Sequence, residues 1–221
     1  MERQQIIDGY SKLRNDIEQE KEKSFEKIVK YINRNFENEK KEEFINQVFN
    51  LILDSLEKTY SLTAAAVKEI YGIQNNNVEN VDVSKLTYSQ DGKTLQDRLN
   101  IHYSKAKDKQ TKFAIQIKEI DLDGLDPNDP VPGLNAAILY FNQRTLLILD
   151  TESSYLSNYL IHNKVKEDAK YAEIYGIGDC HLEDGAPCEE WIRMGKMPIK
   201  ELVELPPYHP GCECEVIYYL E

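Results

Sequence analysis

All four cysteines of the chain fall within residues 180–214, and two of its four histidines lie among them. Segment 205–214 reads Leu-Pro-Pro-Tyr-His-Pro-Gly-Cys-Glu-Cys. Each proline fixes its own φ and pushes the preceding residue out of the helical region, so we expect His209 to be extended. Cys212 and Cys214 are two residues apart and would point to the same face of a strand. The stretch therefore predicts a short, stiff segment in which one imidazole and two thiols converge.

Cys188 or Cys180, from earlier in the same stretch, would complete a tetrahedral set of ligands with His209, Cys212 and Cys214. Three interpretations remain open. The residues could hold a structural zinc ion, form one or two disulfides, or remain free and mostly buried thiols. Because cytosolic thiols stay reduced, a cytosolic chain favours metal or free thiols over disulfides.

A catalytic Cys–His pair is the least favoured chemistry for this stretch. A nucleophilic cysteine needs surroundings that stabilise its thiolate. The neighbouring charged residues have the wrong sign, since they include Glu189, Glu190, Glu213 and Glu215. The sequence also contains no Gly-rich phosphate loop and no Ser-His-Asp arrangement that a motif would identify. We therefore expect no catalytic residues.

Segment 206–214, Pro-Pro-Tyr-His-Pro-Gly-Cys-Glu-Cys, is similar to the P-P-x-H-P-x-C-x-C ending of tailed-phage minor head proteins, the Mu-F-like head-morphogenesis family. Segment 184–188, Asp-Gly-Ala-Pro-Cys, resembles the D-G-R-T-C-x-x-C arm that precedes this ending in the family. Trp191 stands where the second cysteine of that arm would fall, so Cys180 or His181 would have to replace it. Glu213 likewise replaces the usual Arg.

Thr151-Glu152 resembles the Thr-Glu pair that opens a helix upstream in that family. The resemblance covers roughly the last third of the chain well. It implies a structural minor capsid protein that joins the portal or major capsid protein during head assembly, in multiple copies, and aids DNA packaging or delivery. It also implies a location in the host cytoplasm during assembly and afterwards in the virion, inside the capsid or at the portal vertex.

Two other functions remain open. The chain could be a freestanding zinc-binding interaction module, which a closed coordination shell would favour. It could also be a degenerate toxin- or transferase-type enzyme, because some members of the family are fused to such domains. A deep pocket lined by Glu152, His162 and the cysteines would favour the enzyme.

The net charge of the chain is −12, and 30% of its residues are charged. Phosphate contacts need Lys and Arg, so an acidic chain is a poor general binder of nucleic acid. The basic residues are also interspersed with Glu, as in Lys21-Glu-Lys23, and such charges cancel beyond a Debye length of ~8 Å. We therefore expect weak or absent DNA binding and a basic partner surface.

The first residues carry no apolar segment typical of a signal peptide. The most apolar run, residues 134–149, is interrupted by Asn135, Gln143 and Arg144 and does not reach transmembrane length. We expect a protein made in the cytosol, with no membrane partner.

Apolar residues at spacings of three and four predict long helices over residues 2–36 and 38–73, joined as an antiparallel hairpin. Gly72 is a predicted helix stop, and Ser61 is a candidate cap for a continuation of the second helix. The apolar positions thin out between Ile17 and Phe25, so we expect part of residues 2–24 to be poorly anchored in the isolated chain.

The polar run 74–77 is the best internal boundary, and the Asp91-Gly92 turn should precede another helix. Residues 113–120 fit helix or strand. The acidic loop 121–133 lacks the spacing of a calcium-binding EF-hand and reads as turns. Residues 134–168 are predicted to be helical, with a new helix capped by Asp150, Thr151 or Ser153. Predicted strands follow at 171–177, 202–203 and 215–220.

These elements predict a mainly α protein with a small C-terminal β region, an α+β fold. Three regions are expected: a helical hairpin over 1–73, a central helical region over 81–168, and a Cys/His-rich β region over 169–221. Four cysteines and two histidines would fasten the last region.

Overall fold

The computed structural model describes residues 3–73, 82–83, 92–119, 131–176, 187–208, 212 and 214–220, with only the backbone described for 113–119 and 187. The polar run 74–77 and the acidic loop 121–130 lie outside the described residues. So do three candidate ligands, which are Cys180, His181 and His209.

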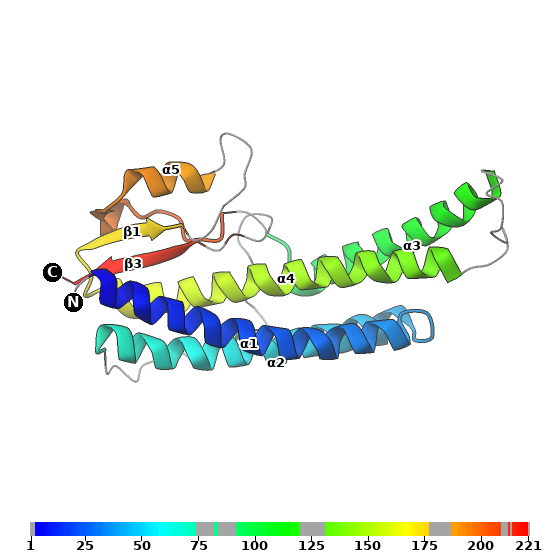
Figure 1. Ribbon diagram of the computed structural model, residues 1–221, viewed down its shortest axis with the longest axis horizontal. Helices are drawn as coiled ribbons and strands as arrows, with labels where there is room; N and C mark the ends of the chain where they lie inside the picture. The colour runs from blue at the N-terminus through cyan, green and yellow to red at the C-terminus, as the bar shows by residue number, and fades with distance from the viewer. Residues whose placement is uncertain are drawn as a thin grey trace.

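Four long helices make up most of the molecule: α1 (Arg3–Asn35), α2 (Lys41–Tyr71), α3 (Leu95–Glu119) and α4 (Val131–Val165). The first two form the predicted hairpin and pack along α4, while α3 runs beside α4 (Figure 1). The α3–α4 pair continues past the turn that joins α1 and α2 (Figure 1). In the described part of the chain, no helix has both the length and the apolar character needed to cross a membrane.

Helix α2 ends as predicted. Gly72 has a left-handed backbone, with φ of 68°, and its N–H donates to the Lys68 carbonyl at 3.0 Å. The predicted helix start at Ser61 is wrong, because this residue lies inside α2 and its hydroxyl donates to the Glu57 carbonyl at 3.0 Å. A hydroxyl that bonds four residues back lets a helix continue without a new cap.

The predicted helix start at residues 150–153 is also wrong, because α4 is continuous from Val131 to Val165. The Thr151 hydroxyl donates to the Leu147 carbonyl at 2.7 Å, which is again the bond of a residue inside a helix. Residues 113–119, which the sequence left open between helix and strand, are the end of α3.

A three-stranded antiparallel sheet follows the helices, with strand order β2-β1-β3. Its strands are β1 (Tyr171–Tyr175), β2 (Met197–Pro198) and β3 (Glu215–Tyr219). The sheet lies between the helices and the short helix α5 (Pro187–Met194) (Figure 1). The predicted mainly α fold with a small C-terminal β region is therefore confirmed.

The predicted strand at 202–203 is wrong. The chain there leaves a short 3-10 turn, η2 (Ile199–Glu201), and continues without a strand partner. Val203 is 76% exposed, so its apolar side chain did not signal a core position. Helix α5 and strand β2 were not predicted; they span only eight and two residues.

Two clusters of buried apolar side chains form the core. The first joins the start of α1, the ends of α2 and α4, and the sheet. The second joins the rest of α1 and α2 to α3 and most of α4. Large buried members of the first cluster include Ile6, Tyr10, Leu13, Val67, Ile70, Val165, Ile174, Val216 and Tyr218. Those of the second include Ile28, Ile32, Phe36, Phe44, Val48, Ile52, Leu99, Phe141 and Leu149.

The start of α1 is packed, contrary to the expected weak anchoring of residues 2–24. Ile6, Tyr10 and Leu13 are buried in the same cluster as β3. The Tyr10 hydroxyl also donates to the Val216 carbonyl at 2.7 Å. The hairpin and the C-terminal β region therefore share one apolar core.

A polar belt separates the two clusters along α1 and α2. It consists of the buried residues Lys21 and Ser24 of α1 and Thr59 and Thr63 of α2. The belt meets α4 through two side-chain contacts. The Lys21 ammonium lies 2.8 Å from Asp150, and the Thr63 hydroxyl lies 3.4 Å from that of Ser157.

Candidate metal centre

Three of the candidate ligands meet in the interior of the C-terminal region. Cys188, Cys212 and Cys214 are each at most 2% exposed. Their sulfur atoms all lie within 4.8 Å of one another, and those of Cys188 and Cys212 are 3.6 Å apart. We call these three residues the thiol cluster. The sulfurs of Cys212 and Cys214 converge as expected, although both residues precede β3 and lie outside the strand.

Helix α5 supplies Cys188, and its packing is close. Pro187 occupies the first helical position, which suits a residue that lacks an N–H. A Cβ added at Gly176 would lie 2.4 Å from Cδ1 of Ile192, so this glycine lets α5 approach the end of β1. Trp191 stacks on Tyr208, with ring centroids 5.9 Å apart and planes 8° from parallel. Trp191 thus has a packing role in the place where the family pattern has a cysteine.

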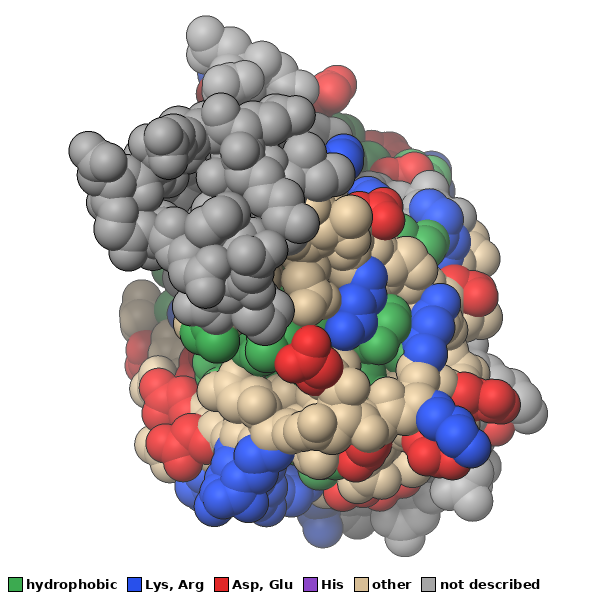
Figure 2. Space-filling model, turned by 90° about the vertical axis from the view of Figure 1, so that its right-hand side faces the viewer, with side chains coloured by type: hydrophobic (Ala, Val, Ile, Leu, Met, Phe, Trp, Pro, Cys, Tyr) green, Lys and Arg blue, Asp and Glu red, His purple; other side chains and the backbone are tan. Residues whose placement is uncertain are grey.

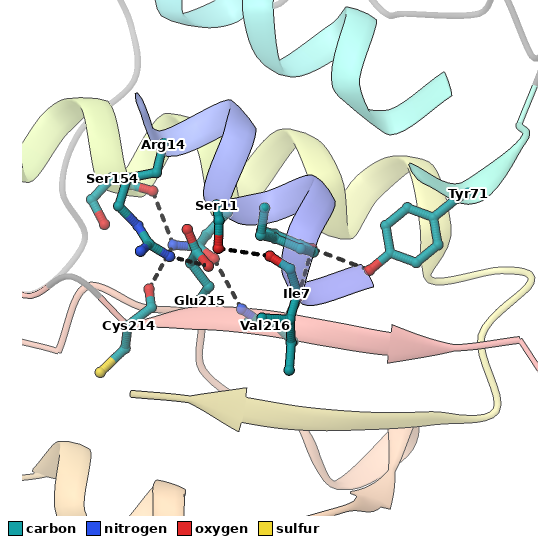
Figure 3. A network of polar contacts seen from close by, with 10 residues as sticks. Ile7, Ser11, Arg14, Tyr71, Ser154, Cys214, Glu215 and Val216 are labelled. Atoms are coloured by element: carbon teal, nitrogen blue, oxygen red, sulfur yellow. Dashed lines mark hydrogen bonds and ion pairs between the residues drawn. The ribbon is translucent and has the colours of Figure 1, made fainter. Parts of the chain in front are cut away.

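Asn158 of α4 fixes the start of β3, directly after the other two thiols in the chain. Its amide nitrogen donates to the Cys214 carbonyl at 3.1 Å, and its amide oxygen accepts from the Val216 N–H at 3.3 Å. Two further side chains reach β3. The Arg14 guanidinium donates to the Glu215 carboxylate at 2.8 Å (Figure 3), and the Tyr71 hydroxyl accepts from the Tyr218 N–H at 3.1 Å. Asn158 was not among the predicted site residues. The available signal was its position between Leu156 and Leu160, because an amide among buried apolar residues indicates a polar group with specific partners.

The electrostatics of the thiol cluster favour a thiolate at Cys212. The Cys214 side chain hydrogen-bonds to this group and lowers the pKa of Cys212 to about 5, against the opposing effect of burial. Burial raises the pKa of Tyr208, and the negative charge of the nearby cysteines raises it further. The Tyr208 hydroxyl therefore stays protonated beside the sulfurs. Thiolate is the form of cysteine that binds metal ions.

The spacing of the sulfurs fits metal ligands better than a disulfide. A disulfide would hold two sulfurs at ~2.05 Å, whereas no disulfide joins the described cysteines Cys188, Cys212 and Cys214. Two thiolates on one tetrahedral zinc ion, each with a Zn–S bond of ~2.3 Å, would lie about 3.8 Å apart. The observed 3.6 Å between Cys188 and Cys212 is close to that value. The thiol cluster is a possible metal-binding site.

The residues proposed for an enzyme do not converge on the thiol cluster. Glu152 is buried in an ion pair with Arg98, on the side of the second apolar cluster. Nδ1 of His162 lies 2.9 Å from the Tyr218 hydroxyl. Burial lowers the pKa of His162, so the ring is neutral at pH 7. A cavity of about 170 Å³ between α1 and α4 is bordered by Cys212, but Glu152 and His162 do not line it.

No family model, curated protein or solved structure matches the chain.

Proposed function

We propose that the chain is a structural, non-catalytic minor head protein of a tailed phage or prophage, whose C-terminal region is fastened by a zinc ion. The observation that carries the proposal is the thiol cluster. Its members are the cysteines of the two motifs that resemble the minor head family, and all three are buried. Three thiolates from α5 and from the approach to β3 would tie these elements together around the ion.

The zinc part of the proposal predicts about one zinc ion per chain after purification under reducing conditions, because a structural site normally retains its metal. Cys188→Ser should remove most of the metal. Met194→Ser, which changes an exposed sulfur-containing residue on the same helix α5, should leave it in place. A value below about 0.3 zinc per chain in the unaltered protein would exclude the site. Parallel Cys180→Ser and His209→Ala variants identify the fourth ligand.

The role in head assembly predicts protein partners, the portal or the major capsid protein, and little affinity for DNA. The end of the molecule seen in Figure 2 supports this, because Lys and Arg side chains there lie next to Asp and Glu. Mixed charges of this kind do not make the basic face that nucleic acid requires. Co-expression with the portal and major capsid proteins of the same virus tests the role. Entry into assembled heads is the expected result, and salt-resistant DNA binding without entry would contradict it.

A freestanding zinc-binding interaction module is the second candidate, because the thiol cluster serves it equally well. The co-expression experiment with the portal and major capsid proteins distinguishes the two functions. A zinc-containing chain that stays out of assembled heads would favour the module. The pocket that would support a toxin- or transferase-type enzyme needs Glu152 and His162 in its walls. Glu152 instead pairs with Arg98, and His162 lies against the Tyr218 hydroxyl.

A further inference from the structure

Cys188 and Cys212 are placed for more than one kind of bond. Their sulfurs are 3.6 Å apart, so a shift of about 1.5 Å would bring them to the ~2.05 Å of a disulfide. Cys188 belongs to α5, and Cys212 belongs to the segment that leads to β3. A disulfide between them would therefore join the same two elements that the proposed zinc ion joins.

The third thiol, Cys214, is a less suitable disulfide partner for Cys212. Residues two apart on an extended chain have Cα atoms about 6.6–7.2 Å apart, whereas most disulfides join Cα atoms that are ~5.5–6 Å apart. The Cys214 carbonyl also accepts a hydrogen bond from the Asn158 amide at 3.1 Å, which limits the movement of this residue. The geometry therefore favours the Cys188–Cys212 pair.

Cys212 also borders a space that a small molecule can enter. It lines the cavity of about 170 Å³ between α1 and α4, together with Glu18, whose side chain is 52% exposed. In Figure 3 the Cys214 sulfur points away from Arg14 and Ser154, which line the same cavity. A reagent as small as hydrogen peroxide would therefore reach Cys212 before the other two thiols of the cluster.

Zinc binding and disulfide formation exclude each other at this site. Zinc is bound by thiolates, and a sulfur in a disulfide no longer carries that charge. Formation of the Cys188–Cys212 bond would leave Cys214 as the one remaining thiolate among the described members of the thiol cluster. The ion would then lose most of its ligands.

We propose that the Cys188–Cys212 pair is a peroxide-sensitive redox site, at which oxidation to a disulfide releases the zinc ion. The Cys212 sulfur attacks one oxygen of hydrogen peroxide. The S–O bond forms as the O–O bond breaks, and the departing hydroxide takes up a proton to give water. The Cys188 thiolate then attacks the sulfur of this sulfenic acid, which forms the S–S bond, breaks the S–O bond and releases a second hydroxide. In total, two thiolates, one hydrogen peroxide and two protons give one disulfide and two water molecules.

This inference rests on the proposed zinc-fastened head protein and adds a change of state to it. Thiols stay reduced in the cytosol, whereas disulfides form and persist outside cells. A protein assembled into heads in the cytosol and released with the particle would exchange its zinc ion for a disulfide. The same two elements stay joined in both environments.

Peroxide titration of the full chain, purified with its zinc, tests the proposal. About one equivalent of hydrogen peroxide per chain should release the bound zinc to a coloured indicator and remove two hydrogens from the intact mass. Peptide mapping without reduction should find Cys188 and Cys212 in one cross-linked pair, with Cys214 still open to alkylation. Dithiothreitol followed by zinc should restore the starting state.

Cys214→Ser is the matched control, because it also removes one thiol of the cluster. The Cys188–Cys212 disulfide should still form in this variant and in Cys180→Ser, whereas Cys188→Ser should abolish it. A disulfide through any other pair, or zinc that stays bound after the peroxide is consumed, would overturn the proposal. A chain purified without zinc would contradict the zinc site alone, because the same mapping then tests the Cys188–Cys212 pair directly.

Discussion

Asn158 satisfies two backbone groups at the start of β3. Asn158→Ala would leave the Cys214 carbonyl and the Val216 N–H buried without that partner. Each unsatisfied buried group costs about 1–3 kcal/mol, so we expect a loss of roughly 2–4 kcal/mol in the free energy of unfolding. Urea unfolding measures this. Asn100→Ala, which removes a surface bond to the Gln96 carbonyl, should change the free energy by less than about 0.5 kcal/mol.

The Arg98–Glu152 ion pair is buried, with side chains 10% and 3% exposed. Arg98→Met should cost about 3–5 kcal/mol, because Glu152 would keep a buried charge without its main partner. A second change, Glu152→Leu, should restore much of the loss, since apolar groups often replace a buried pair without penalty. Thermal and urea unfolding of the two single variants and the double variant give the interaction free energy between residues 98 and 152. Strictly additive losses would contradict this account.

Close helix packing at Gly9 decides how α1 meets α2. A Cβ at this position would lie 2.6 Å from Cγ1 of Ile70, too close for a real contact. Alanine normally stabilises a helix by about 1 kcal/mol over glycine. Here we expect the opposite sign, with Gly9→Ala destabilising by about 1–3 kcal/mol because the core is overpacked. Combining it with Ile70→Ala should cost less than the sum of the single changes, as a double-mutant cycle would show.

The sequence predicted the long elements because their apolar residues repeat at helical spacing over many turns. It failed at Ser61 and at residues 150–153, where polar side chains predicted helix starts. The hydroxyls of Ser61 and Thr151 bond instead to the preceding turn of a continuous helix. A hydroxyl can cap a new helix or bond to the preceding turn of a continuous one. The local sequence permits both, so tertiary packing decides which bond forms.

For the candidate site, the spacing of Cys212 and Cys214 predicted that their sulfurs converge, and Cys188 was named as one of two residues to join them. Asn158 and Trp191 could not be predicted, because their roles depend on β3 and Tyr208, which are distant in sequence. Sequence spacing reports only on neighbours along the chain, whereas these contacts need the finished fold.

At the scale of the whole molecule, both ends of the described chain lie at the sheet end of the bundle (Figure 1). The Arg3 guanidinium donates to the Glu173 carboxylate of β1 at 2.7 Å, and the Tyr219 hydroxyl of β3 donates to the same carboxylate. The bond from Arg3 lowers the pKa of Glu173 below its usual 4.5, and the bond from Tyr219 adds to the effect. The carboxylate therefore holds α1 to two strands while it is ionised.

Since the folded pKa is depressed, this contribution is present above pH 4.5 and is lost as the pH falls through the lowered value. Glu173→Gln should therefore lower the melting temperature at neutral pH and reduce its fall on acidification. Glu69→Gln, which removes an exposed pair with Lys12, is the control and should leave the acid dependence unchanged. If the melting temperatures of Glu173→Gln and of the unaltered protein fall equally with pH, the Glu173 carboxylate is not the source of this acid dependence.

Hydrogen exchange tests whether the start of α1 belongs to the core. Ile6, Tyr10 and Leu13 share the first apolar cluster with β3, so amides of this segment should exchange as slowly as those of the strand. Rapid exchange of residues 6–17, with slow exchange of β3, would restore the weak anchoring expected from the sequence.

The packing of α1 against β3 has a consequence for synthesis. Residues 6–13 leave the ribosome about two hundred residues before residues 215–219, an interval of roughly 10–40 s at ordinary rates of translation. During that time the apolar face of Ile6, Tyr10 and Leu13 lacks the strand that later covers it. The first helix can pair with α2 early, but its final burial comes among the last steps of folding. Nascent chains stalled before residue 215 should therefore expose this face to chaperones.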